Sequence, residues 1–222
     1  MMQRSNNGNH AFSRRHSSCS PKTKVLIVTE GEKTEVAYFQ ECAKDLSIGR
    51  YVTVTHNPDG STPDKVLEYA LFLRKKESRR GSPYGEIYCV MDQDRHSTFV
   101  DTLKKIELLQ KEGEAVRAVA SYPSFEYWLL LHYEFTRRTF EKEGNRSAGD
   151  CVVLALKQHW PDYEKCCKDI YGRLKDELST ALKNAQRARK DAVDTKELNP
   201  STDVDRLVKR LHDFAGVPVD GR

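Results

Sequence analysis

The sequence predicts an α/β protein: a mostly parallel four-stranded sheet flanked by helices, followed by a helical C-terminal extension. Two observations predict this class. From residue 24 to about residue 136, short apolar runs alternate with longer stretches in which apolar residues recur at helical spacing. Beyond residue 136 only helical patterns recur. Strands that alternate with helices form βαβ units, whose right-handed crossovers leave the strands parallel.

The first half of this pattern contains two strands and two helices. A strand over residues 24–29 precedes a helix from Glu32 to about Leu46, and a second strand covers residues 51–55. The turn-rich stretch NPDGSTP follows, in which Ser61 or Thr62 can cap the next helix. That helix carries apolar residues at helical spacing, namely Val66, Tyr69, Ala70 and Leu73.

The second half completes the predicted core and adds the extension. We expect a strand over 86–91, a helix over about 98–111, a strand over 115–120 and a helix that opens at Pro123-Ser124. After a loop, helices are expected over 149–158, 173–193 and 202–214. Residues 24–136 therefore form the predicted α/β core, and residues 137–222 form a helical extension packed on it.

Residues 1–23 form a predicted disordered basic tail. They contain four Lys or Arg residues, no Asp or Glu, and much Ser, Asn and Gly, so they cannot bury enough apolar surface to fold. This tail either contacts phosphate or is simply a solvated end of the chain.

The composition limits the class of protein. The 222 residues are 38% hydrophobic and 32% charged, with a net charge of +4, which allows a nucleic-acid partner only if the basic residues cluster. The six cysteines include no C-x-x-C pair, and Cys89 lies in an apolar strand as a small core residue. No apolar stretch approaches the length of a membrane span, and no signal peptide is evident. We expect a cytoplasmic protein with reduced thiols.

Acidic residues follow two of the predicted strands. Glu30 comes directly after the first strand, and Asp92 and Asp94 come directly after the third. In an open parallel sheet, ligands bind beyond the carboxyl ends of the strands, so these carboxylates meet at one edge if the two strands are neighbours. Residues two apart on an extended segment face the same side, and carboxylates suit Mg²⁺ or Mn²⁺. Gly31 would allow backbone or a phosphate to approach closely.

A structural role for these acids is the alternative. Glu30 and Glu32 can stabilise the N-terminus of the following helix, while Asp92 and Asp94 shape a loop. Glu32 and Glu35 lie further into the helix, where one of them can cap it or pair with Lys33.

Four sequence blocks resemble a known family. Glu-Gly after the first strand and Asp-x-Asp after the third resemble the Toprim fold of topoisomerases, primases and related nucleases. Together with them, LIVTEGEKTEVAYF, MDQDRH, YPSFEYWLLLHY and NPSTDVDRLVKRL resemble the RloB-like family of prokaryotic antiviral defence proteins. The resemblance covers roughly residues 24–214.

The resemblance implies a function and assigns roles. It implies a Mg²⁺-dependent (or Mn²⁺-dependent) nuclease that cuts phosphodiester bonds in RNA, such as tRNA, or in DNA, with a partner ATPase. Glu30 matches the Toprim glutamate, a general acid/base or metal ligand, and Asp92 and Asp94 match the metal-binding aspartates. The rival interpretation is a non-catalytic Toprim-like module that docks the ATPase or a nucleic-acid end.

Four further residues near these acids are candidates for the same site. Lys33 and Arg95 can hold a phosphate or relieve repulsion between the carboxylates as ion-pair partners. His96 can shuttle a proton or be a surface histidine at a helix start. Glu126 follows the fourth strand, where it can join the site or interact with a helix N-terminus.

Two helical patterns have both a structural and a functional interpretation. Phe125, Trp128 and Leu129 are core residues or, less simply, a platform for base stacking. Lys183, Arg187 and Lys190 form a basic stripe that can follow a nucleic-acid backbone, although Asp191 and Asp194 reduce its charge. The stripe is otherwise a solvated face.

Overall fold

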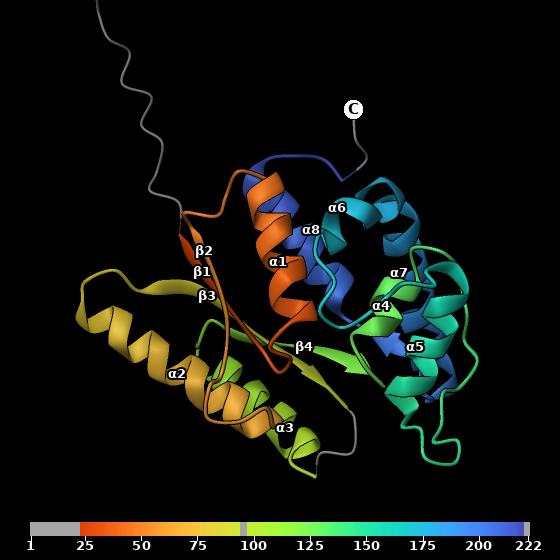
Figure 1. Ribbon diagram of the computed structural model, residues 1–222. Coiled ribbons are helices and arrows are strands. Elements are labelled where there is room, and N and C mark those ends of the chain that lie inside the picture. Colours follow the sequence, from red (N-terminus) through yellow and green to blue (C-terminus); the bar gives the residue numbers. More distant parts are fainter. Residues whose placement is uncertain (1–22, 94–96, 220–222) are drawn as a thin grey trace, which may run out of the picture.

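The structure, a computed structural model, describes residues 23–93 and 97–219. The predicted tail lies outside the described residues except for Thr23. Figure 1 shows a central sheet with helices on both of its faces, which confirms the predicted α/β class.

Five strands form one sheet in the order β2-β1-β3-β4-β5. The first four run parallel, as predicted, and β5 runs antiparallel to β4. The strands are β1 (Lys24–Thr29), β2 (Val52–His56), β3 (Tyr84–Asp92), β4 (Val116–Tyr122) and β5 (Ser201–Thr202). Because β1 lies between β2 and β3, the acids that follow β1 and β3 are at neighbouring positions on the carboxyl edge.

The fifth strand corrects the prediction of four strands. β5 lies in the region expected to be entirely helical, and its two residues are too few to show a strand periodicity. Tertiary contacts hold it in place: the Ser121 and Thr202 hydroxyls lie 3.1 Å apart, and the Asp203 N–H donates to the Ala120 carbonyl at 2.9 Å. The C-terminal region therefore extends the sheet.

Two layers of helices cover the sheet (Figure 1). One layer contains α2 (Pro63–Arg79) and α3 (Phe99–Lys111). The other contains α1 (Thr34–Asp45), α4 (Glu126–Leu130), α5 (Ala148–His159), α6 (Ile170–Leu174), α7 (Leu178–Thr195) and α8 (Val204–Ala215). The helix predicted over 173–193 is in fact α6, a short 3-10 turn over Lys175–Glu177, and α7. None of the helices in the described ranges is long and apolar enough to cross a bilayer.

Each layer has its own hydrophobic core, and β1 contributes to both. Leu26 and Val28 pack in the core beneath α2 and α3, whereas Val25 and Ile27 pack in the core beneath α1 and the C-terminal helices. Alternate residues of a strand point to opposite faces, so this division follows from the strand period of two. Cys89 is fully buried in the α2–α3 core, which confirms that it is a core residue.

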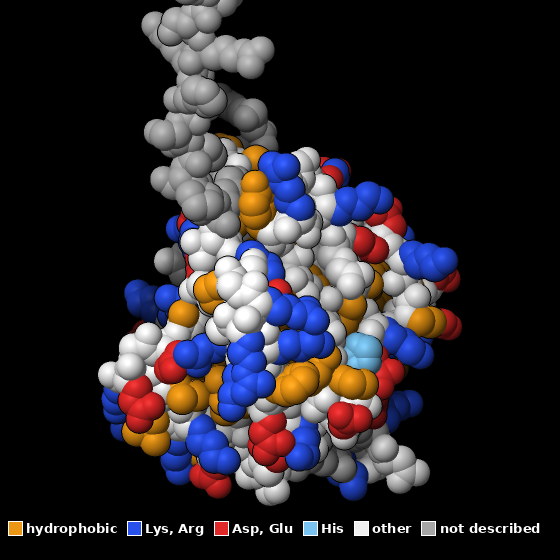
Figure 2. Space-filling view, turned by 90° about the vertical axis from the view of Figure 1, so that its left-hand side faces the viewer, with side chains coloured by type: hydrophobic (Ala, Val, Ile, Leu, Met, Phe, Trp, Pro, Cys, Tyr) orange, Lys and Arg blue, Asp and Glu red, His pale blue; other side chains and the backbone are white. Residues whose placement is uncertain are grey.

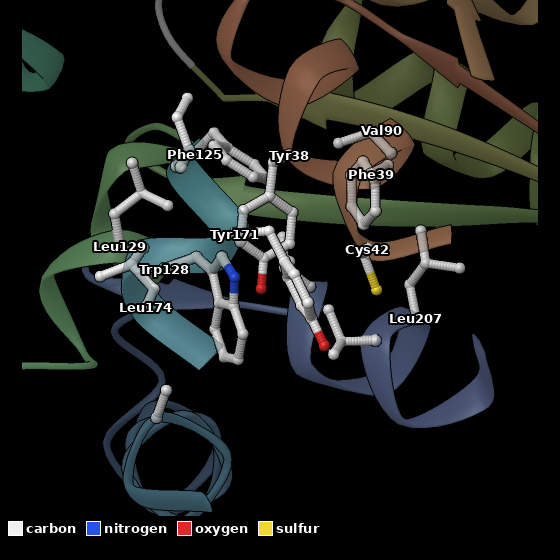
Figure 3. Close-up of a cluster of buried hydrophobic side chains, with 14 of the residues drawn as sticks. Tyr38, Phe39, Cys42, Val90, Phe125, Trp128, Leu129, Tyr171, Leu174 and Leu207 are labelled. Carbon is white, nitrogen blue, oxygen red and sulfur yellow. The ribbon is translucent and has the colours of Figure 1, made fainter. Parts of the chain in front are cut away.

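Aromatic rings join the C-terminal helices to α1 (Figure 3). The Tyr38 ring makes edge-on contacts with Phe125, Trp128 and Tyr171, at centroid distances of 5.6, 6.4 and 5.5 Å. Phe125, Trp128 and Leu129 are fully buried, which confirms the core interpretation over the stacking platform. This packing fixes α4, and with it Glu126, against α1.

His132 is a titratable side chain inside this core. Its Nδ1 lies 3.0 Å from the Trp128 carbonyl oxygen, and its Nε2 is buried without a hydrogen-bond partner among the described residues. Burial lowers the pKa of His132 to about 4, because the charged imidazolium would lose its hydration. Protonation therefore favours the unfolded chain, in which the side chain titrates near pH 6.5.

We expect this histidine to make the protein sensitive to mild acid. The stability that the neutral side chain provides is complete above pH 6.5 and is lost as the pH falls from 6.5 towards 4. The substitution His132→Phe should flatten the decline in the free energy of unfolding over this range, measured by denaturant titration at several pH values. An equally steep decline in the variant would assign the acid sensitivity to other groups.

Candidate functional site

A pocket of about 330 Å³ lies at the carboxyl edge of β1 and β3. The first residue to follow β1 and the last residue of β3 meet there: the Asp92 backbone N–H donates to Glu30 Oε2 at 3.1 Å. The pocket is lined by Glu30, Gly31, Glu32, Lys33, Thr34, Glu35, Ser61, Asp92, Glu126 and Lys165. The structure thus brings together four of the predicted site residues: Glu30, Lys33, Asp92 and Glu126.

Asp92 lies at the centre of the contacts in this pocket, between the end of β3 and the start of α4. Its Oδ2 accepts a hydrogen bond from the Phe125 N–H at 3.1 Å, while its Oδ1 is buried and has no hydrogen-bond partner among the described residues. Burial raises the pKa of Asp92 well above its usual value, and the charges of Glu35, Glu126 and Glu30 raise it further. A cation at this position would offset both the lost hydration of the Asp92 carboxylate and its repulsion by the neighbouring carboxylates.

Glu126 reaches the pocket from the next strand along the sheet. It is the first residue of α4 and is buried. Its Oε2 accepts from the Ser124 hydroxyl at 2.7 Å, and its Oε1 accepts from the Tyr163 hydroxyl at 3.3 Å. The Lys165 Nζ lies 3.6 Å from Oε1, and Glu126 is the main reason that the pKa of Lys165 is raised. These contacts with Ser124, Tyr163 and Lys165 hold the carboxylate in place.

Glu35 also belongs to the pocket, although the sequence analysis offered Glu32 or Glu35 only as a helix cap or as a partner of Lys33. The Glu35 side chain is buried in the pocket, where Oε1 accepts from the Gly31 N–H at 3.1 Å. Burial and the nearby Glu126 raise the pKa of Glu35 to about 7. A Cβ at position 31 would lie 2.2 Å from Glu35 Oε2, so the glycine leaves room for this carboxylate.

Tyr163 and Lys165 are the site residues that the sequence analysis missed. They lie on the segment between α5 and α6, about 40 residues beyond Glu126, and no local pattern marks them. The Thr34 hydroxyl donates to the Lys165 carbonyl at 2.8 Å, which ties this segment to the start of α1. Lys33, just before α1, is exposed at the rim of the pocket.

The remaining site residues from the sequence analysis lie elsewhere or outside the described residues. Asp94, the third predicted metal ligand, is outside them, as are Arg95 and His96. Lys183, Arg187 and Lys190 are exposed on α7 and do not line the acidic pocket. The Arg187 guanidinium lies 3.9 Å from the centroid of the Phe135 ring, beside Asp191 and Asp194.

The chemistry of the pocket fits a hard cation in two respects. Four carboxylates (Glu30, Glu35, Asp92 and Glu126) share a small volume, and one buried oxygen of Asp92 needs a partner. Within residues 23–93 and 97–219, however, no group of three or more His, Cys, Asp or Glu side chains is arranged to hold a metal ion. The metal site therefore stays a prediction.

Comparison with known proteins identifies the family. The family model described as "RloB-like protein" matches residues 25–211, which run from the second residue of β1 into α8. A search of curated proteins finds no match. The match covers most of the chain and contains every residue of the acidic pocket. The chain therefore belongs to the RloB-like family.

Proposed function

We propose that this protein is a metal-dependent nuclease that hydrolyses phosphodiester bonds in RNA, tRNA included, or in DNA, and that it acts in antiviral defence with a partner ATPase. The observation that carries the proposal is the convergence of Glu30, Asp92, Glu35 and Glu126 on one pocket at the carboxyl edge of a parallel sheet. The resemblance of the strand-end acids to the Toprim pattern supports the same chemistry.

Mg²⁺ or Mn²⁺ would be held by Glu30, Asp92 and Asp94. The bound ion would polarise the scissile phosphate and neutralise the charge that develops on its oxygens. Glu30 would move a proton as general acid or base. Lys165 and Lys33 lie at the same pocket as cations that can pair with a phosphate oxygen. The hydrogen bonds from Ser124 and Tyr163 hold Glu126 where it can orient Lys165.

The direct test is cleavage by the purified full chain. RNA and DNA, each single-stranded and duplex, are incubated with Mg²⁺, with Mn²⁺ or with EDTA, and in each case with and without the proposed partner ATPase, which is sought among the products of neighbouring genes. We expect cleavage that requires the metal, and sequencing of the product ends identifies the preferred substrate. No cleavage of any substrate with metal and ATPase together would overturn the proposal.

A non-catalytic docking module is the second candidate, and one observation favours it. The described residues contain no complete set of metal-holding side chains. In this case the pocket would bind the ATPase or a nucleic-acid end through Lys33 and Lys165. Such a module would form a stable complex with the ATPase that is unchanged by EDTA, and it would cut none of the substrates above.

A further inference from the structure

The exposed face of α2 carries one continuous stripe of basic and aromatic side chains. Its five members follow the spacing of a single helical face, at intervals of four, three, four and three residues: Lys65, Tyr69, Phe72, Lys76 and Arg79. We call them the α2 stripe. Val66, Leu67 and Ala70 face the opposite way and are buried against the sheet. At 1.5 Å per residue, the stripe is about 20 Å long.

The C-terminal half of the stripe carries positive charge that no acidic side chain of the described residues neutralises. Lys76 and Arg79, and their neighbour Lys75, have no acidic partner within ion-pair distance in the part of the chain that the structure describes. Lys65, at the other end of the stripe, is paired with Glu68 at 2.8 Å, whereas Glu77 pairs with Lys24 and Arg80, each at 2.9 Å. Figure 2 shows Lys and Arg side chains gathered around hydrophobic ones on the face of the molecule that includes α2.

The two aromatic residues of the stripe stack on each other, with Phe72 exposed and Tyr69 half-buried. The Tyr69 and Phe72 rings lie 6.2 Å apart at an interplanar angle of 19°. Phe72 is 57% exposed, and the Lys76 Nζ lies 6.0 Å from the centre of its ring. An exposed aromatic ring contributes little to the stability of the fold. A flat ring flanked by cations, however, provides a surface on which a nucleic-acid base can stack.

We propose that the α2 stripe binds single-stranded nucleic acid and leads it to the acidic pocket. The stripe begins beside the pocket, because Ser61, two residues before α2, is part of the pocket wall and Lys65 lies on the first turn of the helix. Lys76 and Arg79 contact phosphates, and Phe72 stacks on a base. This inference rests on the proposed function in one respect: it assigns the stripe to the substrate of the same site.

The pattern of the stripe favours nucleic acid over a membrane surface or a protein partner. Membrane-binding helices present a broad apolar face, whereas the exposed apolar surface here consists of one ring and its half-buried neighbour. Protein interfaces are depleted of lysine, and this stripe is rich in it. Isolated rings between cations are instead typical of single-strand binding surfaces.

The experiment measures binding without cleavage. Labelled single-stranded RNA and DNA oligonucleotides of about 16 nucleotides, enough for one binding site, are titrated with the full chain in EDTA, and binding is followed by fluorescence anisotropy at several salt concentrations. The matching duplex and anionic vesicles are titrated in parallel. Phe72→Ala should weaken single-strand binding about tenfold, and Phe72→Trp should preserve it. The double variant Lys76→Ala, Arg79→Ala should reduce the slope of log affinity against log salt by about 0.7 per lost contact.

Control substitutions come from α3 in the same layer of helices. Leu108→Ala removes a side chain with the same 57% exposure as Phe72, and Lys105→Ala with Lys111→Ala removes two exposed cations. These variants should bind like the wild type. Thermal melting of each variant shows that it is folded.

The outcomes separate this inference from the proposed nuclease activity. Two results would show that the α2 stripe does not bind nucleic acid: the wild type binds neither oligonucleotide, or the stripe variants bind the oligonucleotides as tightly as the control variants do. A third result would assign the stripe to membranes instead: the wild type binds anionic vesicles as tightly as the oligonucleotides, and the stripe variants lose this vesicle binding. If stripe-dependent binding is found but no metal and no ATPase produces cleavage, the inference stands and the proposed nuclease activity fails.

Discussion

The Glu30→Gln variant should lose at least about a hundredfold in cleavage rate, roughly 2.7 kcal/mol of activation free energy. Glutamine retains the size of the side chain and an oxygen that can accept the Asp92 N–H hydrogen bond, but it cannot take up a proton or balance a cation. Because the lost interaction belongs mainly to the transition state, substrate binding should change little. The rate is measured under single-turnover conditions with the proposed partner ATPase present, and binding is measured in EDTA.

Glu32→Gln is the matched control for this variant. Glu32 lies two residues away and is exposed at the rim of the same pocket, so its loss alters the local net charge equally. It should cost less than about threefold, since exposed charges are screened by solvent. Equal losses in the two variants would mean that the pocket acts only through its overall charge, and normal cutting by Glu30→Gln would place the reaction on another acid.

Mg²⁺ or Mn²⁺ should stabilise the wild type, and the Asp92→Asn variant should lose this stabilisation. An ion present at a hundred times its dissociation constant stabilises the native state by about 2.7 kcal/mol, which is about 5–10 °C in melting temperature for a protein of this size. Without metal, the variant should be at least as stable as the wild type, because a buried carboxylate beside Glu30, Glu35 and Glu126 is replaced by a neutral amide. The amide oxygen can still accept the Phe125 N–H hydrogen bond.

Differential scanning calorimetry of the wild type and the variant, in EDTA and at increasing metal concentration, gives the stability without metal and the stabilisation by metal. A variant that melts far below the wild type in EDTA would show that the Asp92 carboxyl group has a structural role that an amide cannot replace. A variant that keeps the full metal shift would place the ion elsewhere.

The sequence predicted the site residues that directly follow the ends of predicted strands. Glu30 and Asp92 could be placed together because each ends an apolar run, and parallel strands bring their carboxyl ends to one edge. Glu126 could be proposed for the same reason, since it follows β4. Such positions depend on the order of the elements, which alternating hydrophobicity indicates.

What could not be predicted depends on tertiary contacts without a local signal. Lys165 lies in an irregular segment, and its place at the pocket depends on the contacts of Thr34 and Glu126 with it. The burial of Glu35 depends on the close approach of its carboxylate to Gly31, which has no Cβ. The positions of charged residues along a helix do not reveal such a contact. β5 consists of two residues and is defined by its pairing with Ser121 and Tyr122 rather than by its own sequence.

The attachment of Lys165 to the start of α1 has a consequence for the order in which a ribosome makes the site. Glu30, Glu35, Asp92 and Glu126 are all synthesised before Lys165, and the N–H groups of Asp169 and Tyr171, which bond to the Glu41 carboxylate at 2.7 and 2.8 Å, follow a few residues later. A growing chain therefore carries the acids for some time before it carries the lysine that faces them and the helix that fastens this lysine in place. During translation, the pocket is completed late, so a nascent or prematurely ended chain lacks this cationic wall.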